Sequence, residues 1–497
     1  MAEIAGGDAD RPDRWTSTAV RDEQLAGAGP TTTAVSRRRT WLRWHLPFMI
    51  VLLAGAAIRV IVVLAYRPAV LFPDSISYLA AARRLVPGVN RPLGYSGLLA
   101  PLLYSPHPLL IVAIVQHLMG LAMAVVIYAL LLRWKVRRWL AIVATLPVLF
   151  DSYQLLIEQY IMADTFFELL MVVGLVVLAW KRTPIPLWAC AVSGFALALG
   201  AITRLDGAAL LLPALGYVIL RQPGVRLRIV GAVAMVVTFA VPVGLYAVGY
   251  DLAHGKLALS GYSGHFLYGR VMPFATCTGL SLPAYERSLC PTTPPGHREP
   301  TDFWIWSPKS PAYHLHLPPG KSTDGVLKDF GKRVILNQPG TYTKSVLTNF
   351  VDGFALVRNG SARFQFQRDY PLNGFDPAPV SHKYGDQTPY ADHRYTGFLY
   401  YYGQYVNAPG PLMALALVLG LLGGFGIGRA RRSGMRLVCL LFAVAGLAVL
   451  LPSNAASIFS WRYVLPSLEL LPVAGALGFT ALTARSHRGE PARERQT

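Results

Sequence analysis

The sequence predicts an all-α polytopic membrane protein with about ten transmembrane helices and a small extracytoplasmic α+β insert. Three observations predict this class. Only 14% of the 497 residues are charged and 53% are hydrophobic, with a mean hydropathy of +0.40, whereas soluble domains carry about 25% charged residues. Long apolar runs recur along the chain, and basic residues gather in short clusters between them.

The apolar runs define the predicted spans, because a helix needs about 20 apolar residues to cross the hydrocarbon core. The turn at 203–207 is either a re-entrant turn inside the protein or an exit from the membrane. The predicted spans cover 46–66, 109–132, 139–157, 164–180, 185–203, 207–220, 229–250, 409–428, 437–452 and 463–482.

The basic clusters predict the orientation of these spans. The chain has 46 Lys and Arg against 26 Asp and Glu, a net charge of +20. Clusters fall on alternate loops, so we expect a plasma-membrane protein with both termini in the cytoplasm. Anionic lipid headgroups account for these charges. A nucleic-acid-binding domain is therefore excluded.

The same pattern predicts five regions. The outer segments 67–108, 151–164 and 251–408 are expected to hold the function, because the cytoplasmic loops are too short for a site. The regions are a disordered cytoplasmic tail (1–40), a catalytic membrane module with spans 1–7 (41–250), an extracytoplasmic domain (251–408), the last three spans (409–482) and a basic cytoplasmic tail (483–497).

The insert 251–408 has aromatic and β-branched stretches that resemble strands, and one predicted helix near 324–336. Cys277 and Cys290 lie close together on the predicted oxidising side, so we expect a disulfide. Cys190 and Cys439 lie inside apolar runs and are expected in the core.

Acidic residues stand out on two outer segments. Asp74 precedes a predicted amphipathic helix that starts at Ser75, where it either caps the helix or serves as a general base. Asp151, Glu158 and Asp164 either form an acidic loop end, with Asp164 as a cap, or join Asp74 at a divalent cation. Carboxylates suit Mg²⁺, Mn²⁺ or Ca²⁺.

Two arginines lie at predicted outer span ends. Arg204 either pairs with Asp206 or binds an anion. Arg462 has no acid nearby in sequence, and an outer arginine departs from the basic-inside pattern unless it binds something anionic. A lipid phosphate is the expected ligand.

Together these motifs resemble the GT-C superfamily of polyprenyl-phosphate-sugar-dependent membrane glycosyltransferases. The resemblance covers residues 46–250 and 409–482. Ser75 replaces a second acid that many relatives carry, and position 164 is Asp where relatives more often have Glu. The matching motifs are Pro73-Asp74-Ser75 with Tyr78, Arg91-Pro92-Leu93-Gly94-Tyr95, Tyr153…Glu158…Asp164, Thr203-Arg204-Leu205-Asp206-Gly207 and Trp461-Arg462-Tyr463…Pro466.

The resemblance implies a sugar transfer with inversion, in which Asp74 is the catalytic base. Asp74 and Asp164 would hold a divalent cation, if one is used. The implied partners are a polyprenyl-phosphate-linked sugar donor, the lipid bilayer, and an envelope glycan, lipid or exported protein as acceptor. The residues implied in substrate and phosphate binding are Arg462, Tyr463, Arg204, Glu158, Asp164, Tyr78 and Arg91.

Two other classes remain open at this point. A transporter or flippase of envelope lipids or polysaccharide would place ionisable groups near the bilayer midplane, whereas the acids noted here gather at one predicted face. A non-catalytic envelope scaffold would leave Asp74, Glu158 and Arg462 uncoupled.

Overall fold

The computed structural model describes residues 31–180, 183–358, 365–370, 376–457 and 459–484. The chain comprises two units, residues 1–54 and 55–497. In the first unit, the described part is the beginning of helix α2 (Thr31–Ala65). The predicted disordered tail therefore holds helix from Thr31 onward. Residues 1–30 and 485–497 lie outside the described residues.

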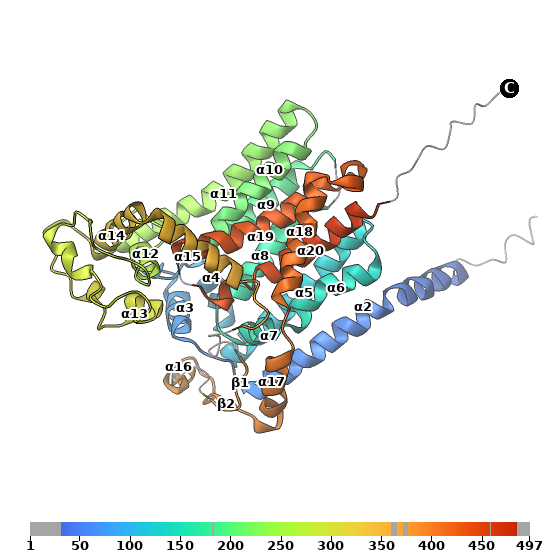
Figure 1. Ribbon diagram of the computed structural model, residues 1–497. Helices are drawn as coiled ribbons and strands as arrows, with labels where there is room; N and C mark the ends of the chain where they lie inside the picture. Colours follow the sequence, from blue (N-terminus) through green and yellow to red (C-terminus); the bar gives the residue numbers. More distant parts are fainter. Residues whose placement is uncertain (1–30, 181–182, 359–364, 371–375, 458, 485–497) are drawn as a thin grey trace, which may run out of the picture. The chain divides into compact units, whose positions relative to one another are not determined.

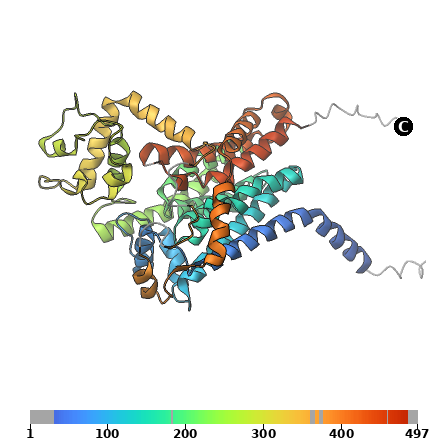
Figure 2. The same cartoon turned by 60° about the horizontal axis from the view of Figure 1, so that its bottom comes forward.

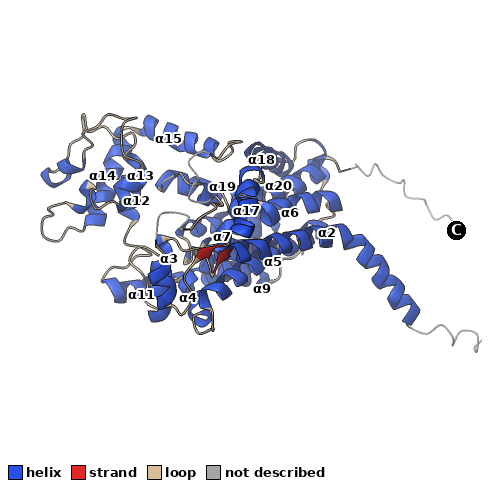
Figure 3. Cartoon of the chain, turned by 90° about the horizontal axis from the view of Figure 1, so that it is seen from below, coloured by secondary structure: helices blue, strands red, loops and turns tan. Residues whose placement is uncertain are grey.

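Helices make up nearly all the regular structure of the second unit (Figure 3). The sequence-predicted all-α class is confirmed. After α2, the first half of the chain contains β1 (Tyr66–Arg67), α3 (Pro73–Arg84), α4 (Gly94–Leu102), α5 (Pro108–Arg133), α6 (Arg138–Phe150), α7 (Ser152–Gln159), α8 (Asp164–Ala179), α9 (Leu187–Ala201), η1 (Leu205–Leu210), α10 (Leu211–Arg221) and α11 (Val225–His254).

The second half continues this helical pattern through the insert and back into apolar helices. Its elements are α12 (Ser263–Val271), η2 (Ala284–Leu289), α13 (Thr301–Trp306), η3 (Pro311–Tyr313), α14 (Thr323–Asn337), α15 (Pro339–Asp352), α16 (Ala378–Lys383), β2 (Tyr390–Ala391), α17 (His393–Tyr405), α18 (Gly410–Phe425), η5 (Gly428–Arg432), α19 (Arg436–Ala456), η6 (Trp461–Tyr463) and α20 (Ser467–Leu482).

Every predicted span contains a helix, but fewer of these helices are long enough to cross a membrane alone. Among the described residues, four qualify by length and composition: Arg43–Ala65, α5, α11 and α19. The number rises to six if the bent pairs α6 with α7 and α17 with α18 each count as one span. Helices such as α10, with 11 residues, fall short of the required length. The chain is a multi-pass membrane protein.

The insert contains less strand than its composition predicts. In its described part the strand is β2, which pairs antiparallel with β1 through Tyr66↔Ala391 and Arg67↔Tyr390. The aromatic residues pack instead between helices, with Tyr268, Trp304 and Phe330 in one buried cluster. Aromatic and β-branched composition reflects burial as much as strand. The predicted helix is present as α14, and Cys277 is bonded to Cys290.

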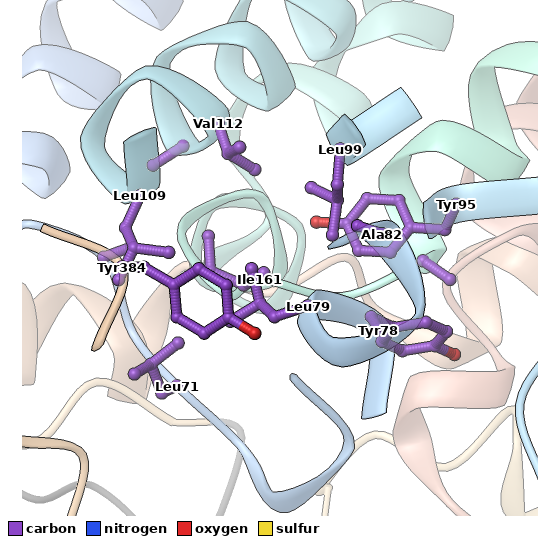
Figure 4. Packing of buried hydrophobic residues seen from close by; sticks show 13 residues of the cluster. Leu71, Tyr78, Leu79, Ala82, Tyr95, Leu99, Leu109, Val112, Ile161 and Tyr384 are labelled. Carbon is purple, nitrogen blue, oxygen red and sulfur yellow. The ribbon is translucent and has the colours of Figure 1, made fainter. Parts of the chain in front are cut away.

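A buried apolar cluster holds α3 against the membrane helices (Figure 4). Tyr78 and Leu79 of α3 meet Tyr95 of α4 and Val112 of α5 in this cluster, and Ile161 joins from the segment after α7. Burying a large apolar side chain is worth about 1.5–3 kcal/mol. The cluster therefore fixes the orientation of α3.

Small residues bring α20 close to its neighbours, and α18, α19 and α20 lie side by side in both views (Figures 1 and 2). A Cβ on Gly475 would lie 2.7 Å from the Cβ of Ala416, and one on Gly478 would collide with the Leu419 carbonyl. Such close packing allows α20 to be buried along most of its length. The start of α20 at Ser467 follows η6 after three residues.

Candidate functional site

Asp74 lies in the first turn of α3, whose cap position is Phe72. The interpretation of Asp74 as a helix cap is therefore wrong. The start of α3 is held instead by Ser75, whose hydroxyl accepts from the Phe72 N–H at 3.0 Å and donates to the Ile161 carbonyl at 2.8 Å. The Asp74 carboxylate is thereby free to bind two arginines.

These arginines come from distant parts of the chain. Arg91 donates from Nη2 to Oδ1 of Asp74 at 2.5 Å. Arg462, in η6, donates from Nη1 to Oδ2 at 3.1 Å. Asp74 is thus held from both sides, by the loop between α3 and α4 and by the segment before α20.

Arg462 continues the network to Asp164, the first residue of α8. The Nε atom of Arg462 lies 2.9 and 3.0 Å from the two carboxylate oxygens of Asp164. Arg204 also donates to Asp164 from Nη1, and lies 3.4 Å from Asp206 through Nη2. The sequence left open whether Arg204 pairs with Asp206 or binds an anion. In the structure, Arg204 contacts the carboxylates of Asp164 and Asp206. Asp74, Asp164, Arg91, Arg204 and Arg462 form one alternating chain of charges.

Close backbone approaches hold this chain of charges in place. Gly94, just after the Arg91 loop, donates its N–H to the Ile202 carbonyl at 2.8 Å. A Cβ at Gly94 would collide with Thr203, next to Arg204. The glycine lets the two site-bearing loops touch, because any side chain there would push them apart.

Two predicted tyrosines lie beside the charges. The Arg204 guanidinium carbon is 5.0 Å from the Tyr463 ring centroid, within cation–π range. Tyr78 is buried, and its ring meets Tyr95 edge-on at 5.1 Å. Tyr463 contacts the charged residues directly, whereas Tyr78, in α3, forms part of the buried apolar cluster.

The arrangement of these charged side chains suits the binding of an anionic ligand. Burial would raise the pKa of the Asp74 carboxyl, but Arg91 and Arg462 together hold that pKa below its usual range. Asp74 is therefore ionised at neutral pH. A guanidinium has more N–H donors than these bonds use, so Arg462 and Arg91 have donors left for a ligand. The Asp74 and Arg462 side chains are 11% and 10% exposed, so the network is accessible at its edge.

The same geometry does not fit a divalent cation. The Asp74 and Asp164 oxygens accept from Arg91, Arg204 and Arg462, and a metal ion would have to displace these guanidinium groups. Within the described part of the chain, no group of three or more His, Cys, Asp or Glu side chains is placed to hold a metal.

Glu158 belongs to a separate buried cluster. Arg59 binds it through two bonds, Nε to Oε2 at 2.8 Å and Nη2 to Oε1 at 2.7 Å. His117 Nδ1 lies 2.8 Å from Glu158 Oε2. Gln154 connects this cluster to Glu168, one helical turn beyond Asp164, at 3.3 and 2.9 Å. Glu158 is therefore bonded to Arg59, His117 and Gln154, and no hydrogen bond among the described residues joins it to Asp74 or Asp164.

The sequence reasoning missed several polar residues near the site. Arg59 is a lone charge inside an apolar run, and that signal could have marked it. Arg358 was not singled out either, and it pairs at 2.7 Å with Asp151, the acid that caps α7. Glu469, in α20, is fully buried, and neither of its oxygens has a hydrogen-bond partner among the described residues.

With this geometry established, the chain can be compared with known proteins. No protein-family model and no curated protein matches it. Three solved chains are similar to it. One belongs to the S. cerevisiae protein O-mannosyltransferase Pmt1–Pmt2 complex bound to the sugar donor. The similarity covers 45% of this chain and 36% of that one, with 14% identity and a TM-score of 0.34.

The other two are ArnT from Cupriavidus metallidurans. In the apo state it is 15% identical, with 88% of this chain and 78% of that chain covered and a TM-score of 0.34. Bound to undecaprenyl phosphate it is 14% identical, with 89% and 78% covered and a TM-score of 0.33.

Proposed function

We propose that this protein is an integral membrane glycosyltransferase. It moves a sugar from a polyprenyl-phosphate carrier to the hydroxyl of an extracytoplasmic acceptor, with inversion at the anomeric carbon. The observation that carries the proposal is the position of Arg462. It bridges Asp74 and Asp164 through Nη1 and Nε, and this supports a pairing of a guanidinium that can bind phosphate with a carboxylate that can take a proton.

In the proposed reaction, the arginines bind the phosphate and Asp74 accepts the proton. Arg462, with Arg204 behind Asp164, binds the carrier phosphate and stabilises its charge as the bond to the sugar breaks. The acceptor oxygen forms the new bond to the anomeric carbon, and Asp74 takes the hydroxyl proton. Atoms and charge balance without a further reactant.

The low pKa of Asp74 sets a condition on this scheme. A carboxylate held by two arginines is a weak base, whereas a general base works best when its pKa lies near the operating pH. When the carrier phosphate takes N–H donors of Arg462, Asp74 loses part of that stabilisation and its proton affinity rises. Binding of the sugar donor therefore makes Asp74 a stronger base.

The test uses the purified full chain in nanodiscs. Undecaprenyl phosphate serves as the binding probe, and radiolabelled polyprenyl-phosphate sugars serve as donors. We expect binding of undecaprenyl phosphate and release of free carrier phosphate that depends on acceptor. Envelope analysis of a deletion strain would identify the missing sugar linkage.

The rival function predicts a different result in the same preparation. A flippase moves a labelled lipid across a sealed vesicle and leaves the sugar–phosphate bond intact. Lipid translocation without cleavage of that bond would reject the transferase and favour the flippase.

A further inference from the structure

Arg91 has contacts on both sides, with Asp74 and with the insert. Its guanidinium carbon lies 5.5 Å from the ring centroid of Trp306, the last residue of α13. Its Nε is buried and has no hydrogen-bond partner in the described part of the chain. The orientation of the guanidinium therefore depends on one ion pair and one aromatic ring.

Trp306 is itself the end of an aromatic stack. Its ring stacks on Tyr262 at 5.4 Å with an interplanar angle of 18°, and Tyr262 stacks on His265 at 4.3 Å and 20°. Phe266 meets the edge of Trp306 at 5.7 Å. His265, Tyr262 and Trp306 thus form one stack, which ends at Arg91.

The far end of the stack is anchored by Asp324, the second residue of α14. Its Oδ1 accepts from the backbone N–H of Gly264 at 2.7 Å and lies 3.2 Å from His265 Nδ1. Burial would raise the pKa of the Asp324 carboxyl, but these hydrogen bonds hold it below its usual range. An ionised Asp324 thus ties His265 to the helical core of the insert.

The loop that carries Arg91 is hydrogen-bonded to the same segment of the insert. Gly261, just before Tyr262, donates to the Val89 carbonyl at 2.8 Å, and the Tyr250 hydroxyl donates to the same carbonyl at 3.1 Å. A Cβ at Gly261 would lie 2.7 Å from the Tyr250 oxygen. The backbone contact and the ring contact therefore hold Arg91 from two directions.

We infer that the insert sets the geometry of the site, with Trp306 as a positioning residue that holds Arg91 against Asp74. This inference rests on the function proposed above. When Trp306 is lost, the long Arg91 side chain becomes free to leave the site, and Asp74 keeps Arg462 as its remaining cationic partner. The other ionisable groups near Asp74 are Asp164 and Tyr78.

Three variants of α13 test the inference in the full chain. Trp306→Leu removes the aromatic face, and Trp306→Phe keeps a smaller one. Phe303→Leu is the matched control, because Phe303 lies in the same helix and contacts Trp304. Each variant is assayed for kcat, donor KM, pH dependence of kcat and melting temperature.

We expect Trp306→Leu to lower kcat by roughly 10- to 100-fold and to change donor KM much less, because Arg462, the proposed phosphate ligand, stays in place. The acidic limb of the pH profile should move to higher pH, since burial raises the pKa of Asp74 once Arg91 no longer opposes it. Trp306→Phe should restore most of kcat, and Phe303→Leu should keep the wild-type pH profile. An unmoved acidic limb in Trp306→Leu would overturn the inference.

A second measurement needs no catalysis and therefore separates this inference from the proposed function. Trp306→Leu and Arg91→Gln are combined in a double-mutant cycle on thermal unfolding. If the stack holds Arg91, the double variant should lose less stability than the two single losses added together. Strict additivity would reject the contact, whereas a wild-type protein that transfers no sugar would reject only the proposed function.

Discussion

Arg462 and Asp164 are 298 positions apart in the chain, yet Nε of Arg462 lies 2.9 and 3.0 Å from the two oxygens of Asp164. The same guanidinium reaches Asp74 through Nη1. Both bonds use the planar fork of arginine, whose N–H groups point in fixed and different directions. The Arg462 side chain therefore links η6 to both α3 and α8.

The first prediction concerns Arg462→Lys. Lysine keeps the positive charge, but its single ammonium group does not reproduce the fork that bridges two aspartates. We expect the affinity for undecaprenyl phosphate to fall by roughly 10- to 100-fold, the equivalent of about 1.4–2.8 kcal/mol. Arg394→Lys is the matched control, because Arg394 is exposed and its ion pair among the described residues is with Asp392. Equal affinity in wild type and Arg462→Lys would remove Arg462 from the phosphate site.

The second prediction concerns Asp74→Asn, which separates catalysis from binding. Asparagine has no proton affinity to offer, so turnover should fall by about 10²–10⁴-fold. Donor binding should hold or tighten, because Arg91 and Arg462 lose a competing carboxylate. Turnover and undecaprenyl phosphate binding are measured on the same preparation. Near-normal turnover would refute the base assignment.

The membrane explains why part of this site could be predicted. Asp74, Asp164, Arg204 and Arg462 each stand at the predicted outer end of an apolar run. The bilayer fixes the depth of such ends, so residues far apart in sequence are expected at one level. A common depth in the membrane does not determine which of these residues contact each other. The sequence therefore indicated Glu158 as a member of the site, whereas its partner is Arg59, 99 positions away.

The insert could be predicted less well, for a different physical reason. Its aromatic and β-branched stretches predict strands, but rings such as Trp304 pack equally well between short helices. The contact of Trp306 with Arg91 joins residues more than two hundred positions apart and leaves no periodic signal. By contrast, α14 has a capping serine, Ser322, whose hydroxyl accepts from the Gly325 N–H, and local signals of this kind made that helix predictable.

The third prediction concerns the pairing of Cys277 with Cys290. The two cysteines are 13 positions apart, and closing a loop of that size stabilises a protein by about 3 kcal/mol in the chain-entropy model. Replacing both by serine should lower the melting temperature of the full chain, and reducing agent should no longer affect it. Mass spectrometry of non-reduced peptides checks the bond directly. Two free thiols there would contradict the pairing.

The fourth prediction follows from the low pKa of Asp74. A carboxyl whose pKa is lower in the folded state than in the unfolded state contributes stability above the unfolded value of about 3.9. This contribution is lost as the pH falls through that value toward the folded pKa. Wild type should therefore melt at a higher temperature than Asp74→Asn at pH 7, and the gap should close below about pH 4. A gap that stays constant over this range would show that Asp74 is not stabilised as a carboxylate.

The last prediction concerns the buried pair of Arg59 and Glu158, whose side chains are 3% and 0% exposed. Glu158→Gln keeps the size of the side chain but leaves the Arg59 guanidinium without an anionic partner. Breaking one side of a buried ion pair costs about 3–5 kcal/mol, so the melting temperature should fall by many degrees. Adding Arg59→Met should recover part of that loss, because it removes the unpaired charge. If Arg59→Met made Glu158→Gln less stable still, the hydrogen bonds from Arg59 to the Gly55, Val148 and Leu149 carbonyls would outweigh the unpaired charge, and the prediction would fail.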